Sequence, residues 1–288
     1  MRSRQRILMA ATLAGLLSSA AGAQTLSGPE SIEYHARLDR TLISNTDNGT
    51  IVARAPDGTL SLFSAAPNSP YGIELLAGTL FVLDSGSVKG YDIDTAAPVM
   101  NLPVAGAGFL NGITSNGIDT LYVSDFGTKT ITAIDVSDLQ SPLQATPVPT
   151  GGLTPNGVVF DRLGQRILIA TWGTGASILS LGLTPGATPT PLIDTSLSNL
   201  DGIALDCRGR IFVAAWGGCA SGGCLRRYDP PFALDSAAQA VVDGLSSPAD
   251  IDYDWVSGNI AVPQSGNNTV SFHPSGCESA IFASDFER

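Results

Sequence analysis

The sequence is poor in charge, and above all in basic residues. Of its 288 residues only 15 are Lys or Arg, against 26 Asp or Glu, so the formal net charge at pH 7 is −11. Three of the arginines stand within the first six residues, and the remainder of the chain is therefore more acidic still. A chain with this balance and no run of basic residues repels phosphate backbones and anionic lipid surfaces. We expect no nucleic-acid partner.

Motifs of several common enzyme classes are also missing. The chain has only two histidines, His35 and His273, and no serine has glycine both two positions before and two positions after it, which excludes a nucleophile elbow. Ser-His-Asp arrangements built from distant residues remain a lesser alternative. H-E-x-x-H, P-loop and complete G-x-G-x-x-G sequences are absent too. Their absence argues against zincin proteases, nucleoside triphosphatases and dinucleotide-dependent enzymes.

Long apolar runs are scarce, because about one residue in six is Gly or Pro. The apolar run from Ile7 to Leu17 follows the first arginines and ends in small residues at Ala21, Gly22 and Ala23. This pattern is typical of a secretory signal peptide, residues 1–23, cleaved before Gln24. The run is too short for a transmembrane anchor. The sequence predicts an exported protein, periplasmic or extracellular, without a membrane anchor.

The four cysteines, Cys207, Cys219, Cys224 and Cys277, all follow the predicted cleavage site. Exported compartments favour disulfides, and four cysteines permit three pairings. We favour Cys219 with Cys224, which closes a glycine-rich loop, and on weaker grounds Cys207 with Cys277. A metal thiolate site is the lesser alternative, because no C-x-x-C pair exists.

A repeat runs through the rest of the chain. Each copy has a turn, a short apolar run, a polar turn, a second apolar run, a glycine-rich break and a third run. The copies recur at intervals of 40 to 48 residues and open with PESIEY (29–34), PYGIEL (70–75), LNGITS (110–115), PNGVVF (155–160), LDGIAL (200–205) and PADIDY (248–253). Repeats of this length indicate a solenoid, propeller or array.

The apolar runs predict strands. The second run of a copy, for example TLYVSD (120–125) or RIFVAAW (210–216), is rich in Val, Ile and aromatic residues and is bounded by turn residues. Three or four strands in each of six copies predict an all-β, six-bladed β-propeller over residues 24–276, followed by a C-terminal tail, residues 277–288. Either residues 25–26 or residues 281–282 could complete the sixth blade.

The second residue of each opening motif is called the anchor here. We expect each anchor to stand just before the innermost strand of its blade, so that six side chains form a ring at one mouth of the channel: Glu30, Tyr71, Asn111, Asn156, Asp201 and Ala249. Carboxylate and amide oxygens are hard ligands, which suit Ca²⁺ better than zinc or copper. The alternative is that N-G and D-G pairs simply make turns.

Glycine follows three of the four anchors that could be metal ligands, at Gly112, Gly157 and Gly202. Glycine tolerates backbone conformations that other residues avoid. We expect these positions to allow a sharp backbone turn at the rim of the channel.

The anchor ring resembles that of the gluconolactonase/regucalcin (senescence marker protein) family of six-bladed, metal-dependent lactonases. The resemblance implies that Glu30, Asn156 and Asp201 hold a divalent metal ion, with Asp201 also acting as the general base. The oxygen ligands favour Ca²⁺ as this ion. It places Asn111 beside the substrate. The family has an arginine two residues before that asparagine, where this chain has Phe109. A less polar cyclic ester is therefore at least as plausible a substrate as a sugar-acid lactone.

Aromatic residues complete the expected site. Trp172 and Trp216 end the second run of their copies, which predicts that they lie on the same face as the anchors and bind substrate together with Tyr71 and Phe109. Packing between blades is the alternative. The sequence thus predicts a monomeric, exported hydrolase of a lactone or related ester, with a small-molecule substrate. The other hypothesis is a non-catalytic propeller scaffold that binds a protein partner or carbohydrate, with a structural metal or none.

Overall fold

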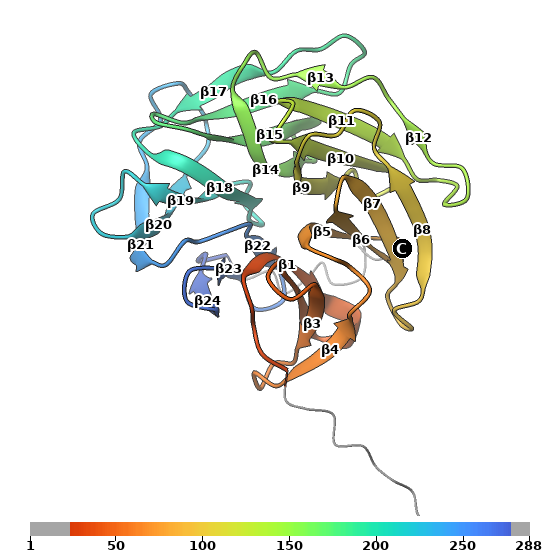
Figure 1. Ribbon diagram of the computed structural model, residues 1–288. Coiled ribbons are helices and arrows are strands. Elements are labelled where there is room, and N and C mark those ends of the chain that lie inside the picture. Colours follow the sequence, from red (N-terminus) through yellow and green to blue (C-terminus); the bar gives the residue numbers. More distant parts are fainter. Residues whose placement is uncertain (1–23, 278–288) are drawn as a thin grey trace, which may run out of the picture.

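The computed structural model describes residues 24–277; the predicted signal peptide and residues 278–288 of the predicted tail lie outside the described residues. Within that range the chain consists of strands, turns and one 3-10 turn, Ala36–Leu38. The strands form six separate antiparallel sheets that stand around a common axis (Figure 1). The prediction of an all-β, six-bladed propeller is confirmed. No helix in this range is long and apolar enough to cross a membrane.

Each sheet is one blade, and the blades are numbered here in chain order. The strands of blades 1 and 2 are β1 (Pro29–His35), β2 (Arg40–Asn45), β3 (Thr50–Arg54), β4 (Leu60–Ser64), β5 (Pro70–Leu76), β6 (Thr79–Asp84), β7 (Ser87–Asp92) and β8 (Pro98–Pro103). The strands of blades 3 and 4 are β9 (Leu110–Ser115), β10 (Thr120–Asp125), β11 (Thr130–Asp135), β12 (Leu143–Gln144), β13 (Val148–Pro149), β14 (Thr154–Asp161), β15 (Arg166–Trp172), β16 (Ser177–Gly182) and β17 (Thr190–Asp194). The strands of blades 5 and 6 are β18 (Ser198–Leu205), β19 (Ile211–Gly217), β20 (Gly223–Tyr228), β21 (Gln239–Leu245), β22 (Asp252–Asp254), β23 (Asn259–Gln264) and β24 (Thr269–Pro274).

The first strand of each blade lies at the axis, where it contacts the first strands of both neighbouring blades. The same contacts join β1 to β22 and β23, so that the two ends of the described chain meet and close the ring (Figure 1). We call this boundary between blade 6 and blade 1 the seam. No sheet in residues 24–277 combines strands from both sides of the seam. Hydrogen bonds cross it instead, from the Ser31 hydroxyl to Asp250 Oδ2 (3.0 Å) and from the Tyr34 amide to Asp252 Oδ2 (3.0 Å).

Blade 6 has three strands among the described residues. Residues 25–26 form no strand, although Leu26 packs against the buried cluster of Ile32, Ile43, Val52 and Ala261, which spans the seam. Residues 281–282, the other candidate for the fourth strand, lie outside the described residues. The other buried clusters also lie between adjacent blades, because apolar residues alternate along the strands and face the neighbouring sheet. Phe212 of blade 5, for example, shares a buried cluster with Ile260 of blade 6.

The glycines that follow the anchors allow neighbouring first strands to approach closely. A Cβ atom on Gly112 would lie 2.5 Å from the carbonyl oxygen of Asn156, and one on Gly157 would lie 2.4 Å from that of Asp201. Gly202 meets blade 6 in the same way. None of the three has a positive φ angle. The expectation of a sharp turn is therefore wrong: these positions need glycine for space at the crowded axis, not for backbone freedom.

Both expected disulfides are present. Cys219 and Cys224 close the loop between β19 and β20, and their Cα atoms are 5.8 Å apart. Cys207 and Cys277 join the β18–β19 connection of blade 5 to the residue that follows blade 6, with Cα atoms 6.1 Å apart. The second disulfide holds the end of the propeller against the preceding blade.

Candidate functional site

The sequence predicts that each anchor stands just before its first strand. The structure instead places five anchors inside these strands, and Ala249 alone precedes its strand. In blades 1 to 5 the pairing with the second strand is irregular at this point. In β14, for example, the three-residue step from Pro155 to Val158 faces a two-residue step on β15, from Thr171 to Ile169. The same β-bulge contains the anchor and the following residue in β1, β5, β9 and β18. A bulge redirects a side chain out of the alternation of the sheet, so the anchors of blades 1 to 5 are redirected alike.

A serine of the second strand supports the bulge in two blades. In blade 3 the Ser124 hydroxyl accepts a hydrogen bond from the Gly112 amide (2.8 Å) and donates one to the carbonyl oxygen of Asn156 in blade 4 (2.6 Å). Ser44 joins blade 1 to the carbonyl oxygen of Tyr71 in the same way (2.8 Å). These bonds satisfy backbone groups that the bulge leaves unpaired, and they fix one anchor relative to the next.

Asn156 and Asp201 lie together at the mouth of the channel. The Asn156 amide donates through Nδ2 to Asp201 Oδ1 (3.2 Å) and to the carbonyl oxygen of Leu200 (3.4 Å). Both side chains are buried, with 2% and 3% of their surface exposed. The Asn156 Oδ1 atom has no hydrogen-bond partner within residues 24–277. A buried carbonyl oxygen without a partner costs free energy, and it is the group that a cation would satisfy.

Glu30 stands close enough to Asp201 for the two carboxylates to repel each other. Burial raises the pKa of Glu30 to about 7. Burial raises the pKa of Asp201 well above its usual value, and the charges of Glu30 and Asp250 raise it further. No basic side chain among the described residues lowers the pKa of either group. Two buried carboxyl groups of the mouth therefore lack a counter-ion among the described residues, and without one their burial favours the protonated form.

These donors fit a hard divalent cation. Two carboxylates and an unpartnered amide oxygen supply oxygen ligands only, and a positive ion between them would remove both the repulsion and the unsatisfied carbonyl. The sulfur atoms of Cys219 and Cys224 lie near a carboxylate oxygen of Asp243, but they are joined in a disulfide and so are not available as thiolate ligands. The predicted ligands Glu30, Asn156 and Asp201 thus share one region.

Asn111 occupies the equivalent position in β9 and is 7% exposed. Its side chain forms no hydrogen bond to Glu30, Asn156 or Asp201 among the described residues. Its carboxamide remains available to a ligand, and its role beside the substrate stays a prediction.

Five aromatic side chains form a continuous series beside the anchors, which we call the aromatic arc: Tyr71, Phe109, Phe126, Trp172 and Trp216. Neighbouring ring centroids are 4.8 Å apart for Tyr71 and Phe109, 5.7 Å for Phe109 and Phe126, 6.0 Å for Phe126 and Trp172, and 5.1 Å for Trp172 and Trp216. All four contacts are edge-to-face, the geometry that the ring quadrupoles favour. The four aromatic residues expected to bind substrate are thus brought together on the arc.

The two ends of the aromatic arc lie beside the two carboxylates of the mouth. At one end, burial raises the pKa of Tyr71, and the charge of Glu30 raises it further. At the other end, the Trp216 indole N–H donates to the carbonyl oxygen of Pro248 (2.9 Å), and a hydrogen bond from this side chain also lowers the pKa of Asp201. The arc therefore borders the candidate metal site.

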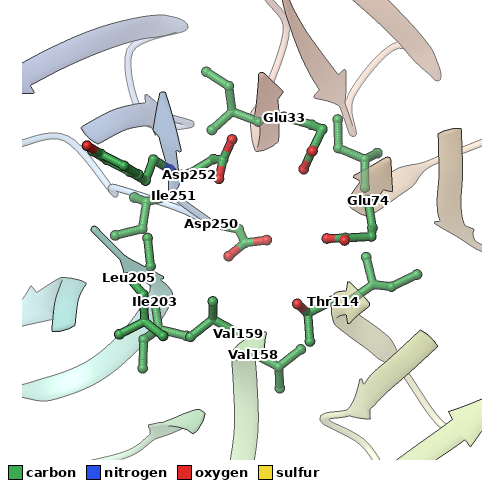
Figure 2. A pocket seen from close by; sticks show the side chains of 15 residues that line it. Glu33, Glu74, Thr114, Val158, Val159, Ile203, Leu205, Asp250, Ile251 and Asp252 are labelled. Atoms are coloured by element: carbon green, nitrogen blue, oxygen red, sulfur yellow. Dashed lines mark hydrogen bonds between the residues drawn. The ribbon is translucent and has the colours of Figure 1, made fainter. Parts of the chain in front are cut away.

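Below the mouth, the channel contains a second set of carboxylates around a cavity of about 140 Å³. Figure 2 shows Asp250 reaching toward the middle of the channel, with Glu33, Glu74 and Asp252 on one side. The opposite side is apolar and is lined by Val158, Val159, Ile203 and Leu205 (Figure 2). The channel is thus acidic along blades 6, 1 and 2 and apolar along blades 4 and 5.

The channel carboxylates hold protons more strongly than usual. Burial raises the pKa values of Glu74 and Asp250 to about 8 and that of Asp252 to about 6. Burial and the charges of its acidic neighbours raise the pKa of Glu33 well above its usual value. Hydrogen bonds oppose the shift in part, for example the one from the Ser115 hydroxyl to Glu74 (2.6 Å). Near neutral pH the channel is therefore partly protonated.

Among solved structures, this chain resembles a gluconolactonase from Xanthomonas campestris. The two share 14% sequence identity at a TM-score of 0.68, over 88% of this chain and 87% of the other. A virginiamycin B lyase from Staphylococcus aureus, solved with quinupristin, gives 12% identity and a TM-score of 0.61 over 88% and 87%. A chain of a nidogen/laminin complex gives 15% and 0.62 over 82% and 92%.

At these identities the likeness shows the propeller fold alone, since a propeller can carry many functions. No protein-family model matches the sequence. No curated protein matches it either. The comparisons therefore place a lactonase and an antibiotic lyase among the structural neighbours. The activity of this chain must be argued from its own residues.

Two residues of the site escaped the sequence analysis. Phe126 occupies the seventh position of its second run, as do Trp172 and Trp216, so aligning the repeats would have found it. Asp250 stands at the position where blades 2 to 5 have glycine, and aligning the opening motifs of the six copies shows this difference. That its carboxylate enters the channel follows from the backbone and could not be read from the sequence.

Proposed function

We propose that this protein is an exported, monomeric hydrolase of a lactone or related ester, dependent on a divalent metal ion, most suitably Ca²⁺, at the channel mouth. The observation that carries the proposal is the group of Glu30, Asn156 and Asp201: two buried carboxylates without a counter-ion beside an amide oxygen without a partner. The two disulfides agree with an oxidising, exported environment. The gluconolactonase among the structural neighbours supports the same reaction class.

Each residue has a defined part in this proposal. Glu30, Asn156 and Asp201 would hold the ion, which when bound supplies positive charge to the ester carbonyl and to the oxyanion that develops from it. An Asp201 carboxylate oxygen accepts a proton from the attacking water. The acyl carbon gains the hydroxyl, the ring C–O bond breaks, and the proton passes to the leaving alkoxide, giving one hydroxy acid. Asn111 orients the substrate through its free carboxamide.

The first test is metal analysis of the purified protein, followed by a panel of lactones assayed with and without chelator. We expect about one divalent ion per chain and turnover that EDTA abolishes and Ca²⁺ restores. A bound ion without chelator-sensitive turnover of any lactone would instead favour the non-catalytic scaffold.

The second test replaces the proposed base. Asp201→Asn keeps the shape of the side chain but removes the proton acceptor, so we expect lactone turnover to fall by about 10²-fold or more. Glu74→Gln is the matched control, because it neutralises a buried carboxylate of the channel outside the proposed ligand set, and it should keep most of the activity. Unchanged turnover in Asp201→Asn would exclude Asp201 as the base.

A further inference from the structure

The aromatic arc is only partly buried, whereas a purely structural cluster would be fully buried. Trp216 has 40% of its surface exposed, and the other four rings are half-buried. By contrast, Phe81 and Phe212, on the second strands of blades 2 and 5, are 1% exposed. A contiguous apolar surface that faces solvent beside a set of convergent polar groups is typical of a ligand-binding site.

The rings are also held in place before any ligand arrives. Each ring of the arc packs edge-to-face against the next, so none can turn without disturbing its neighbour. Asp125 accepts hydrogen bonds from the backbone amides of Gly108 (2.7 Å) and Phe109 (2.9 Å), which fixes the loop that carries Phe109. The bond from Trp216 to Pro248 fixes the far end. A preorganised wall binds with a smaller entropy cost than a mobile one.

The chemistry of the arc selects against a polyhydroxylated ring. The Trp216 indole N–H is already engaged with the carbonyl oxygen of Pro248. Phe109 and Phe126 offer no hydrogen-bonding group at all. Sugar hydroxyls placed against these two phenylalanine rings would lose hydrogen bonds to water without replacement, whereas an aromatic ring would gain dispersion and edge-to-face contacts there.

We propose that the aromatic arc binds an aryl ring carried by or fused to the substrate, so that the preferred substrate is an aryl lactone rather than a sugar lactone. The inference rests on the proposed function for the position of the ester carbonyl, between Glu30 and Asp201, where the two ends of the arc lie. Hydrolysis of dihydrocoumarin, the simplest such compound, would add one water, break the ring C–O bond and release one phenolic carboxylic acid.

Binding is tested separately from turnover. The probe is 3,4-dihydroquinolin-2-one, the lactam that corresponds to dihydrocoumarin and contains no ester, titrated calorimetrically into the mature, Ca²⁺-loaded protein. We expect it to bind, and we expect Phe126→Leu to weaken its affinity about fivefold. Phe160→Leu is the matched control, because Phe160 stacks on Tyr122 outside the arc, and it should leave the affinity unchanged. Thermal melting shows that each variant is folded.

The outcomes separate this inference from the proposed function. If the lactam of gluconic acid binds as tightly as the quinolinone, or if Phe126→Leu leaves quinolinone affinity unchanged, the inference is wrong. If the quinolinone binds through Phe126 but dihydrocoumarin and gluconolactone are both left intact, the hydrolase proposal fails while the ligand class of the arc stands. Faster turnover of dihydrocoumarin than of gluconolactone, reduced by Phe126→Leu but not by Phe160→Leu, supports both.

Discussion

At the scale of single residues, the absence of a Cβ atom at the axial glycines allows the first strands of neighbouring blades to approach closely. Gly157 is the clearest case, because an added Cβ would lie 2.4 Å from the Asp201 carbonyl oxygen, which is a backbone atom. We expect Gly157→Ala to lower the free energy of unfolding by roughly 2–4 kcal/mol and to disturb the Asn156–Asp201 pair. Urea unfolding measures the first effect and calcium affinity the second.

Gly182→Ala is the matched control. Gly182 lies at the end of β16, has no positive φ angle, and would place its Cβ no closer than 3.9 Å to another atom. Its replacement should change stability by no more than about 0.5 kcal/mol. Equal losses in the two variants would contradict the close-packing explanation.

The residues of the site differ in how far the sequence could predict them. Asn156 and Asp201 were predictable because both recur at one position of a repeat and carry ligand chemistry. Phe126 belonged to a repeated position as well, but only a comparison of the second runs would have shown it. Asp250 could not be assigned a role in advance, since the direction of its side chain depends on the path of the backbone between blades 5 and 6.

At the scale of elements, the alternation of apolar runs and turns sufficed to predict the strands. Each run is bounded by Gly, Asn or Asp, and these residues end strands for local reasons. The bulges in the first strands were not predictable, because a bulge depends on pairing with the neighbouring strand, for example the two residues of β18 between Leu200 and Ile203 that face one residue of β19. The bulges explain why the anchors occur inside a strand and still reach the mouth.

The Cys207–Cys277 disulfide is the element whose removal should matter most for stability. It closes a loop of 70 residues, and loop-closure entropy predicts a loss of about 4 kcal/mol when both cysteines are replaced by serine. The Cys219–Cys224 disulfide closes a separation of 5 residues, for which the same relation predicts about 2 kcal/mol. Denaturant unfolding of the two double variants tests the order. A larger loss from the short loop would contradict the entropic account.

At the scale of the whole molecule, the acidic channel sets the pH dependence of stability. Glu74 has a pKa of about 8 in the folded protein, against 4.5 for an ordinary glutamate. Between these values the folded protein binds protons that the unfolded chain has released, so stability falls as pH rises through this window. In EDTA, we expect the melting temperature to increase as pH is lowered from 8 to 5.5.

Glu74→Gln tests whether the channel causes this trend. The amide cannot ionise, so the variant should be more stable than the parent at pH 7, by on the order of 3 kcal/mol at most, and its melting temperature should vary less with pH. The melting temperatures of the parent and the variant are also compared in saturating Ca²⁺ in place of EDTA. A melting temperature that rises toward pH 8 in the parent protein would show that other groups dominate.

The seam gives the site a mechanical role in addition to a chemical one. Since no strand of residues 24–277 is shared across it, the ring is closed there by side-chain packing and by hydrogen bonds to Asp250 and Asp252. Glu30 lies on one side of this junction, and Asn156 and Asp201 belong to blades on the other. An ion held by all three would link blade 1 to blades 4 and 5 across the channel, and we expect such a link to slow the separation of blade 1 from blade 6 at the seam.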